Sequence, residues 1–212
     1  MKILRNYPLE LLQLMLICKN HTSEVNLVGG CVRDMLLNKQ PKDFDIVING
    51  ELEAITNELK YNGWKIDEAG LNFLVTIATR NGHQFEIAMY RKDGTYTDGR
   101  RPDSVEVGTI TDDAIRRDFT INSLYFDPFT DILLDPTTKG LKDIEERIIR
   151  FNGKAKDRIQ EDYLRIMRCY RFAAQLGFEI ESKALKACRT YFDHMCKTIP
   201  SERIKIEVEK MI

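Results

Sequence analysis

Along the first 150 residues, short apolar runs alternate with segments of helical periodicity, which predicts a mixed α/β domain. The expected helices span residues 9–18, 31–37, 52–60 and 111–121, and the expected strands span residues 25–28, 44–48, 73–79, 84–89, 124–126 and 132–134. Asn81-Gly82 is a strong two-residue turn signal, so the strands on either side of it are expected to form a hairpin. A second hairpin is expected around Asp127-Pro128. Residues 91–103 are polar, contain glycine and are expected to form a mobile loop.

After about Phe151 the strand signals vanish and helical periodicity remains. Helices are expected at residues 159–176, 182–189 and 201–211, with Gly177 ending the first of them. The expected fold class is therefore α+β. It has a head with a small mixed sheet at residues 1–150 and an all-helical neck at residues 151–212.

The amino-acid composition limits the classes of protein to which the chain can belong. Hydrophobic residues at 43% and charged residues at 31% describe an ordinary globular protein, and no apolar run reaches the roughly 20 residues of a membrane span. Five cysteines and three histidines provide no zinc-binding spacing, so reduced thiols in a cytoplasmic protein are expected. The net charge is −1, but residues 139–171 carry ten Lys or Arg against six Asp or Glu, which favours a local phosphate-binding surface.

The strongest chemical signal is Asp43-Phe44-Asp45 on a predicted strand. Side chains alternate between the faces of a strand, so the two carboxylates share one face while Phe44 packs inward. Paired carboxylates bind hard cations such as Mg²⁺, and two such ions activate a hydroxyl and stabilise a leaving pyrophosphate. Without further support, the pair is equally explained as two surface acids at the start of a strand.

The strand-turn-helix before this pair supports the catalytic interpretation. Gly29-Gly30 ends a strand, where glycine lets backbone N–H groups approach a phosphate. Arg33, one turn into the following helix, can add a charge-assisted contact. Glu86 is a candidate third acid on strand 84–89, although an exposed glutamate on a half-buried strand explains it equally well.

Two further segments combine acids with arginines. Residues 113–122 contain four candidate nucleotide-binding residues, namely Asp113, Arg116, Arg117 and Asn122. Asp113 and Arg117 would share one helix face, either as an intrahelical ion pair or as groups that bind phosphate, hold ribose or orient an arginine. The second segment, 161–171, places Asp162, Arg165, Arg168 and Arg171 on one stripe of a predicted helix. This stripe is either a salt-bridged solvent face or a site that recognises a base edge.

Taken together, these segments resemble the class II tRNA nucleotidyltransferases (CCA-adding enzymes) and the related bacterial poly(A) polymerases. The resemblance rests on ordered blocks of sequence: LVGGCVRD with DFD, YTDGRRPDSVEVG, DAIRRDFTIN, EDYLRIMRCYRFAAQLGF and SERIKIEVEKM. It implies a polymerase-β-like nucleotidyltransferase head followed by a helical neck. The implied reaction is template-independent addition of C and/or A to the 3′ end of tRNA from CTP and ATP.

The resemblance also implies residue roles. Asp43 and Asp45 would hold Mg²⁺, and Gly30, Arg33 and Arg117 would contact the nucleotide. Asp162 and Arg165 would recognise the base, with Arg168 and Arg171 near the triphosphate. Cytosine and adenine each present an amino donor beside a ring-nitrogen acceptor, which one carboxylate and one arginine satisfy together. Uracil and guanine would leave both protein groups mispaired, at a cost of about 1–3 kcal/mol per group.

Three alternatives remain at this stage. The chain is a nucleotidyltransferase, including one that makes poly(A); a catalytically idle nucleotide- or RNA-binding piece; or a nucleotidyltransferase acting on a small molecule or protein. The intact loop at residues 96–107 argues against an enzyme that adds only CC. Members of the family usually continue into further helical domains, whereas this chain stops at Ile212 inside a helical pattern, so a fragment is expected.

Overall fold

The computed structural model describes residues 3–96 and 103–211, so residues 97–102 of the loop predicted at 91–103 lie outside the described residues. The chain forms two compact units that are interleaved along the sequence. The first comprises Met1–Lys92, Val105–Ala114 and Asn122–Pro136, and the second comprises Asp93–Ser104, Ile115–Ile121 and Thr137–Ile212. Among the helices of the described residues, none has the length and apolar character that a membrane crossing requires.

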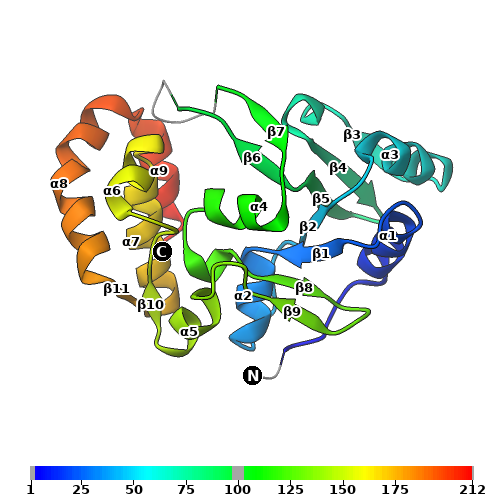
Figure 1. Ribbon diagram of the computed structural model, residues 1–212, viewed down its shortest axis with the longest axis horizontal. Coiled ribbons are helices and arrows are strands. Elements are labelled where there is room, and N and C mark those ends of the chain that lie inside the picture. The colour runs from blue at the N-terminus through cyan, green and yellow to red at the C-terminus, as the bar shows by residue number, and fades with distance from the viewer. Residues whose placement is uncertain (1–2, 97–102, 212) are drawn as a thin grey trace. The chain divides into compact units, whose positions relative to one another are not determined.

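A seven-stranded mixed sheet organises the first unit, in the order β3-β4-β5-β2-β1-β8-β9 (Figure 1). Its strands are β1 (Val25–Val28), β2 (Asp45–Ile48), β3 (Lys65–Asp67), β4 (Val75–Arg80), β5 (His83–Met89), β8 (Tyr125–Asp127) and β9 (Ile132–Leu134). β2 pairs antiparallel with β1 and parallel with β5. The start of β2 and the carboxyl end of β1 therefore lie together at one rim of the sheet, beside Glu86, the fourth residue of β5.

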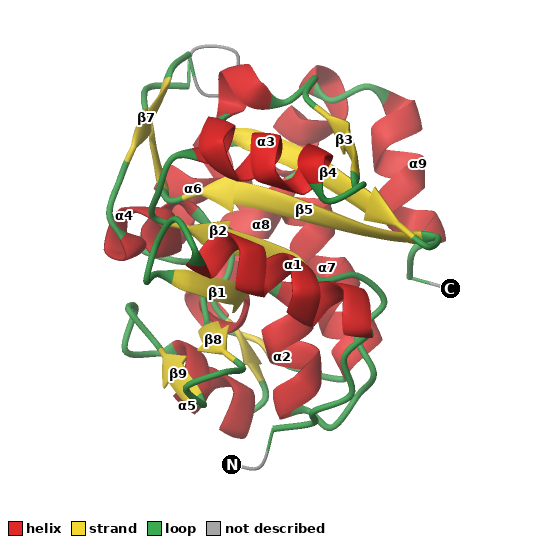
Figure 2. Cartoon of the chain, turned by 90° about the vertical axis from the view of Figure 1, so that its right-hand side faces the viewer, coloured by secondary structure: helices red, strands yellow, loops and turns green. Residues whose placement is uncertain are grey.

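Helices complete the first unit. They are α1 (Leu9–Lys19), α2 (Gly30–Leu36), α3 (Leu52–Tyr61) and the start of α4 (Ile110–Arg116), with a 3₁₀ turn η1 (Leu71–Phe73). α1 and α3 cover one face of the sheet (Figure 2). Near the middle of the sheet, Val47 packs in a buried cluster with Val28, Ala88, Tyr90, Ala114 and Tyr125. This cluster covers the strand face that carries Val47.

Several expected elements are confirmed, and the hairpins are the clearest. Strands β4 and β5 pair antiparallel up to Arg80 and His83, leaving Asn81-Gly82 as the turn. Both turn residues have positive φ, 51° and 80°, as a two-residue type I′ turn requires. β8 and β9 form the second expected hairpin. The short strands β6 (Arg91–Asp93) and β7 (Val105–Val107) pair with each other and were not expected from the sequence, which placed residues 91–93 in the loop.

The second unit is mainly helical. Its helices are α5 (Gly140–Glu145), α6 (Ala155–Glu161), α7 (Arg165–Leu176), α8 (Ser182–Thr198) and α9 (Ser201–Glu209). A 3₁₀ turn η2 (Thr120–Asn122) and a two-stranded parallel ribbon of β10 (Ile148–Ile149) and β11 (Glu179–Ile180) complete the elements. As predicted, Gly177 ends α7 in the left-handed region, with φ of 68°. The helical segment thus contains one two-residue strand, which its sequence did not predict.

Three predicted helix boundaries were wrong. The helix expected at 182–189 continues to Thr198 as α8, and the other two errors lie beside candidate site residues. The helix expected at 111–121 ends at Arg116, because Phe119 turns into a core where its ring packs against Phe151 and Phe172. The helix expected at 159–176 is two helices, α6 and α7, separated at residues 162–164. Asp162 is extended there, with φ of −149° and ψ of 104°.

Candidate active site

The turn between β1 and α2 depends on glycine. Gly29 has φ of 79° and ψ of −130°, a region that a residue with a Cβ adopts only under strain. Its N–H donates to the carbonyl oxygen of Leu124, which ties the turn to the segment before β8. At Gly30, an added Cβ would meet only the tip of Arg33 at 3.6 Å, an ordinary contact. The two glycines therefore have different physical roles, backbone conformation at Gly29 and open space at Gly30.

This difference gives a stability prediction. Gly29→Ala is expected to lower the free energy of unfolding by about 1–3 kcal/mol because it forces a strained backbone. Gly30→Ala, at the first position of a helix, is expected to change it by less than about 1 kcal/mol. Denaturant unfolding of both variants and the parent checks this. Equal loss in the two variants would show that the turn is not constrained as the structure indicates.

Arg33 is held in a defined orientation. Its guanidinium donates to the Asp34 carboxylate at 2.9 and 2.7 Å and to Oδ1 of Asn122 at 2.6 Å. Arg33 is only 7% exposed, so these partners fix a nearly buried charge beside Gly30. The structure thus brings together Arg33 and Asn122, two of the predicted nucleotide-binding residues. Asp34, which the sequence did not single out, completes their network.

The three predicted catalytic acids lie on the rim of the sheet. Asp43 is exposed and lies two residues before Asp45, which is the half-buried first residue of β2. Asp45 is in register with Glu86 on β5 and with Val28 on β1, whose next residue is Gly29. Neighbouring residues in register point to the same face, so the Asp45 and Glu86 carboxylates lie side by side. The acids therefore occupy the middle of a rim that has the glycine turn on one side and β5 on the other.

These acids suit a metal ion whose remaining ligands come from the substrate. Within residues 3–96 and 103–211, no group of three or more His, Cys, Asp or Glu side chains is arranged to hold a metal ion alone. Mg²⁺ commonly uses one or two carboxylates and takes its remaining ligands from water and substrate phosphates. Asp43 and Asp45 could supply such a pair, and the adjacent Gly29 turn with Arg33 could receive the phosphates.

Asp113 is placed differently from Asn122. Its carboxylate is fully buried and accepts a hydrogen bond of 2.6 Å from the hydroxyl of Tyr125. This burial favours the expected alternative in which Asp113 orients neighbouring groups, because a direct contact with ribose would need an exposed oxygen. The predicted face shared by Asp113 and Arg117 was wrong, since α4 ends at Arg116 and Arg117 lies beyond it. Arg116 and Arg117 are both half-buried.

In the second unit, Asp162 does not lie on a helix with the arginines as predicted. It follows α6, and its Oδ1 accepts a hydrogen bond of 3.0 Å from the N–H of Leu164 at the start of α7. Burial raises the pKa of Asp162, while that N–H and the nearby Arg165 act in the opposite direction. The other carboxylate oxygen, Oδ2, takes no part in this hydrogen bond and is the oxygen through which Asp162 could accept from a base.

Arg165 is buried and anchored from several sides. Its guanidinium donates to the carbonyl oxygen of Arg158 at 2.8 Å and to the Glu161 carboxylate at 2.6 Å. Arg158 pairs with the same carboxylate and donates to the carbonyl oxygens of Arg116 and Arg117. These contacts fix the orientation of Arg165, which is the requirement for a side chain that recognises a base by geometry.

The two remaining arginines of α7 have acidic partners. Arg168 donates through Nε to Asp118 at 2.8 Å, and this carboxylate raises the pKa of Arg168. Arg171 forms an ion pair of 2.6 Å with Glu207 of α9 and lies over the ring of Phe172. Neither Asp118 nor Glu207 was predicted as a site residue. Asp118 directly follows Arg116 and Arg117 in the sequence. An acid in that position could have been identified as the partner of a nearby arginine, as it is of Arg168.

A mixed sheet with strand-borne carboxylates beside a glycine turn defines the class of nucleotidyltransferase-type head domains. The chain belongs to the poly A polymerase head domain family, whose family model matches residues 25–150.

Curated relatives support this assignment. The chain is 39% identical over 188 residues to the CCA-adding enzyme of Oceanobacillus iheyensis, across 87% of this chain and 44% of the relative. It is 40% identical over 190 residues to the CCA-adding enzyme of Leuconostoc citreum, across 89% of this chain and 45% of the relative. The chain thus spans less than half the length of these relatives.

Solved structures show the same fold. The Bacillus stearothermophilus CCA-adding enzyme in complex with CTP superposes with a TM-score of 0.82 and 30% identity, over 95% of this chain and 47% of that one. A tRNA nucleotidyltransferase complexed with a primer tRNA and an incoming ATP analog gives a TM-score of 0.74 and 26% identity, over 92% of this chain and 55% of that one. The predicted fold class and family resemblance are therefore confirmed.

Proposed function

We propose that the chain carries the catalytic part of a template-independent RNA nucleotidyltransferase that adds C and/or A to the 3′ end of tRNA from CTP and ATP. The observation that carries this proposal is the placement of Asp43, Asp45 and Glu86 on one rim beside the Gly29 turn and the oriented Arg33. Similarity to CCA-adding enzymes, and to one solved with CTP and one with a primer tRNA, supports the choice of substrates.

In the proposed reaction, the RNA 3′ oxygen forms a bond to the α-phosphorus as the bond from that phosphorus to the β-phosphate oxygen breaks. Asp43 and Asp45 would hold Mg²⁺, which when bound would lower the pKa of the attacking hydroxyl and neutralise charge on the phosphates. Glu86, beside Asp45, accepts the hydroxyl proton. Arg33, oriented by Asp34 and Asn122, binds the triphosphate and then the departing pyrophosphate. Gly29 and Gly30 let the backbone approach the same phosphates.

Base selection is assigned to the second unit. Asp162 accepts from the amino group of C or A, and Arg165 donates to the adjacent ring nitrogen. The contacts of Arg165 with Glu161 and the Arg158 carbonyl support this role, because they hold the guanidinium in one orientation. Arg168 and Arg171 are proposed to lie near the triphosphate, with Asp118 and Glu207 as their positioning partners. We assign catalysis to residues 1–150 and base selection to the neck at residues 151–212.

Incubation of the chain with labelled CTP or ATP, Mg²⁺ and tRNA that lacks its 3′ end tests the proposal. Extension of the tRNA with release of pyrophosphate is expected. The length and composition of the tail decide between CCA, CC, A and poly(A) addition. Poly(A) synthesis is the second candidate. It is favoured because the chain belongs to the poly A polymerase head domain family. Nucleotide binding without extension would mean that this piece is catalytically idle, as the remaining alternative holds.

The compartment in which the reaction takes place is inferred from the proposed tRNA substrate and from the free cysteine thiols. All five cysteines are free, and four of them are buried. Free thiols are typical of the cytoplasm, where we place the reaction.

Binding of tRNA is expected to be weak and strongly salt-dependent. The exposed cations of the basic segment are Lys139, Lys142, Arg147, Lys154 and Lys156. Each phosphate contact contributes about 0.7–0.9 to the slope of log affinity against log salt, so the double variant Lys154→Ala/Lys156→Ala should reduce the slope by up to about 2. Filter binding at several salt concentrations measures this. An unchanged slope would show that tRNA contacts another surface.

A further inference from the structure

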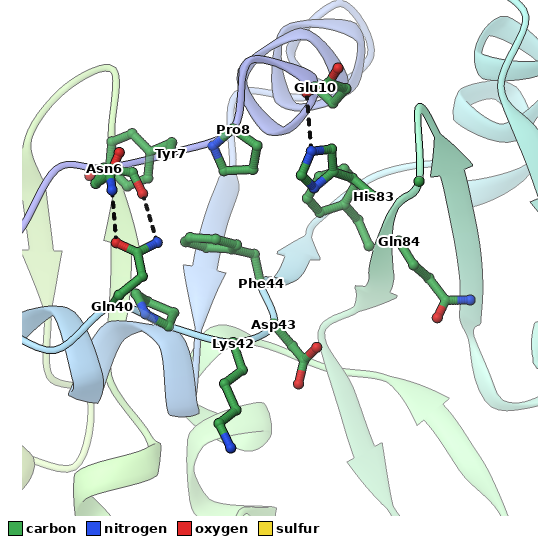
Figure 3. A pocket seen from close by; sticks show the side chains of 13 residues that line it. Asn6, Tyr7, Pro8, Glu10, Gln40, Lys42, Asp43, Phe44, His83 and Gln84 are labelled. Atoms are coloured by element: carbon green, nitrogen blue, oxygen red, sulfur yellow. Dashed lines mark hydrogen bonds and ion pairs between the residues drawn. The ribbon is translucent and has the colours of Figure 1, made fainter.

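The proposed site uses carboxyl groups in two different environments. Asp43 is exposed, and its side chain points away from the buried ring of Phe44 (Figure 3). Asp162 is half-buried, and burial disfavours the charged form of a carboxyl. A carboxyl whose free oxygen accepts from an amino group must be charged, because protonation turns that oxygen into an O–H donor. Asp162 therefore depends on nearby cations more than Asp43 does.

Helix α9 packs along α7, and two contacts fix how the two helices are aligned (Figure 1). Arg171 of α7 pairs with Glu207 of α9 at 2.6 Å, and the Gln175 side chain donates to the carbonyl oxygen of Lys210. Residue numbers rise together across these contacts, so the helices run side by side in the same direction. Arg203, one turn before Glu207 on the same face of α9, therefore lies beside the first turn of α7.

The guanidinium of Arg203 is available to act on Asp162, which directly precedes that turn. In the part of the chain that the structure describes, the buried Nη1 of Arg203 has no hydrogen-bond partner. Burial raises the pKa of Asp162, and the positive charges of Arg165, Arg168 and Arg203 act against this increase. Arg165 and Arg168 each pair closely with another carboxylate. Arg203 is thus the cation of this group whose charge no carboxylate neutralises at ion-pair distance within the described residues.

Two further titratable groups lie around Asp162. Glu161 precedes it at the end of α6 and is paired with Arg165. His194 of α8 is exposed, and its ring centroid lies 4.4 Å from that of Tyr163, the residue after Asp162. Neither group is changed by a substitution at Arg203, so a comparison of the parent with such a variant isolates the effect of Arg203.

We propose that Arg203 is a positioning residue of the base-recognition site, whose charge keeps the free oxygen of Asp162 an acceptor. This inference rests on the proposed function, in which Asp162 accepts from the amino group of C or A. Its consequence is that nucleotide preference depends on pH. As the pH falls through the pKa of Asp162, the free oxygen becomes an O–H donor, which suits the carbonyls of U and G. Without Arg203, this change should occur at higher pH, because an opposite charge lowers the pKa of a carboxyl.

Binding of CTP and of UTP in the presence of Mg²⁺, measured by isothermal titration calorimetry from acidic to neutral pH, tests this role. The ratio of the two affinities cancels the titration of the triphosphate, which both nucleotides share. In the parent, the preference for CTP should decline as the pH falls. In Arg203→Gln, the midpoint of this decline should lie about one pH unit higher, since a nearby opposite charge lowers the pKa of a carboxyl by about 1–3 units.

Lys205→Gln is the matched control. It removes the same charge from an exposed position of α9, where Lys205 pairs with Glu209, and should keep the parental midpoint. Arg203→Lys retains the charge and should also keep that midpoint, which a role in packing alone does not predict. Urea unfolding shows which variants are folded, and Arg203→Met, with an unbranched stem, takes the place of Arg203→Gln if the latter does not fold.

Three results would overturn the inference. They are a preference in the parent that does not change with pH, equal midpoints in the parent and the folded uncharged variant, and a raised midpoint in Arg203→Lys. Because binding needs no turnover, a chain that shows the expected midpoints without extending tRNA would refute the proposed function and leave the role of Arg203 standing. Extension of tRNA by a chain whose midpoint ignores Arg203 would do the reverse.

Discussion

Asp43→Asn and Asp45→Asn are each expected to lower the rate of nucleotidyl transfer by about a thousandfold or more. An amide keeps the shape of the carboxylate but removes the charge that holds Mg²⁺. The lost metal contribution to the transition state is several kcal/mol, and about 1.4 kcal/mol corresponds to a tenfold change in rate. Single-turnover extension of tRNA with labelled CTP measures the effect. Mn²⁺ binding in the presence of CTP, followed by electron paramagnetic resonance, should weaken in parallel.

The same substitutions should leave folding intact. Asp43 is exposed, and Asp45 lies beside Glu86 in register, so each substitution removes one of several neighbouring negative charges. The melting temperature is therefore expected to stay equal or to rise slightly. Glu53→Gln, at an exposed position of α3, makes the same charge change away from the rim and should keep full activity. Turnover within about tenfold of the parent in either aspartate variant would exclude these residues as essential metal ligands.

The second large effect concerns Asp162, where the expected result is a change of nucleotide preference. Asp162→Asn keeps an oxygen that can accept from the N–H of Leu164, so the start of α7 should be preserved. The amide presents an N–H₂ donor where the carboxylate accepted. It should disfavour the amino groups of C and A and favour the carbonyls of U and G. With about 1–3 kcal/mol for each mispaired group, kcat/KM for UTP relative to CTP should rise by one to two orders of magnitude.

Arg165→Ala is the matched comparison for this substitution. One guanidinium serves both bases, so CTP and ATP use should fall together without a gain for UTP or GTP. Arg165 also contacts Glu161 and the Arg158 carbonyl, so unfolding must be measured alongside activity. If Asp162→Asn retains the parental order of the four triphosphates while remaining folded, Asp162 acts only as the cap of α7 and does not recognise the base.

Local chemistry determined much of the first unit. The strand from Val25 to Val28 has the bounds that its apolar run predicts, and the Asn81-Gly82 turn joins the two strands that its sequence predicts. These features are predictable because a short β-rich run, or a turn that needs positive φ, leaves few alternatives within a few residues. The sequence also predicts that Asp43 and Asp45 share one face, because side chains alternate along an extended segment, although β2 itself begins at Asp45.

The tertiary structure decided where two helices end and how the arginines are held. Periodicity continues through Asp162 and Arg117, yet neither residue is helical. Packing of Phe119 against distant aromatic rings and binding of the α4 carbonyls by Arg158 favour other backbone conformations there. Such contacts join residues about 30 to 50 positions apart, so no local pattern contains them.

The candidate site can also be divided into features that the sequence predicts and features that only the tertiary structure decides. The sequence by itself determined which side chains are candidates for the chemistry, because paired acids, a glycine turn and clustered arginines are local motifs. Only the tertiary structure decided their partners, among them Asn122 for Arg33, Asp118 for Arg168 and Glu86 for Asp45. The physical reason is that strand order and side-chain contacts bring together segments that are far apart along the chain, and their free energy depends on the whole folded core.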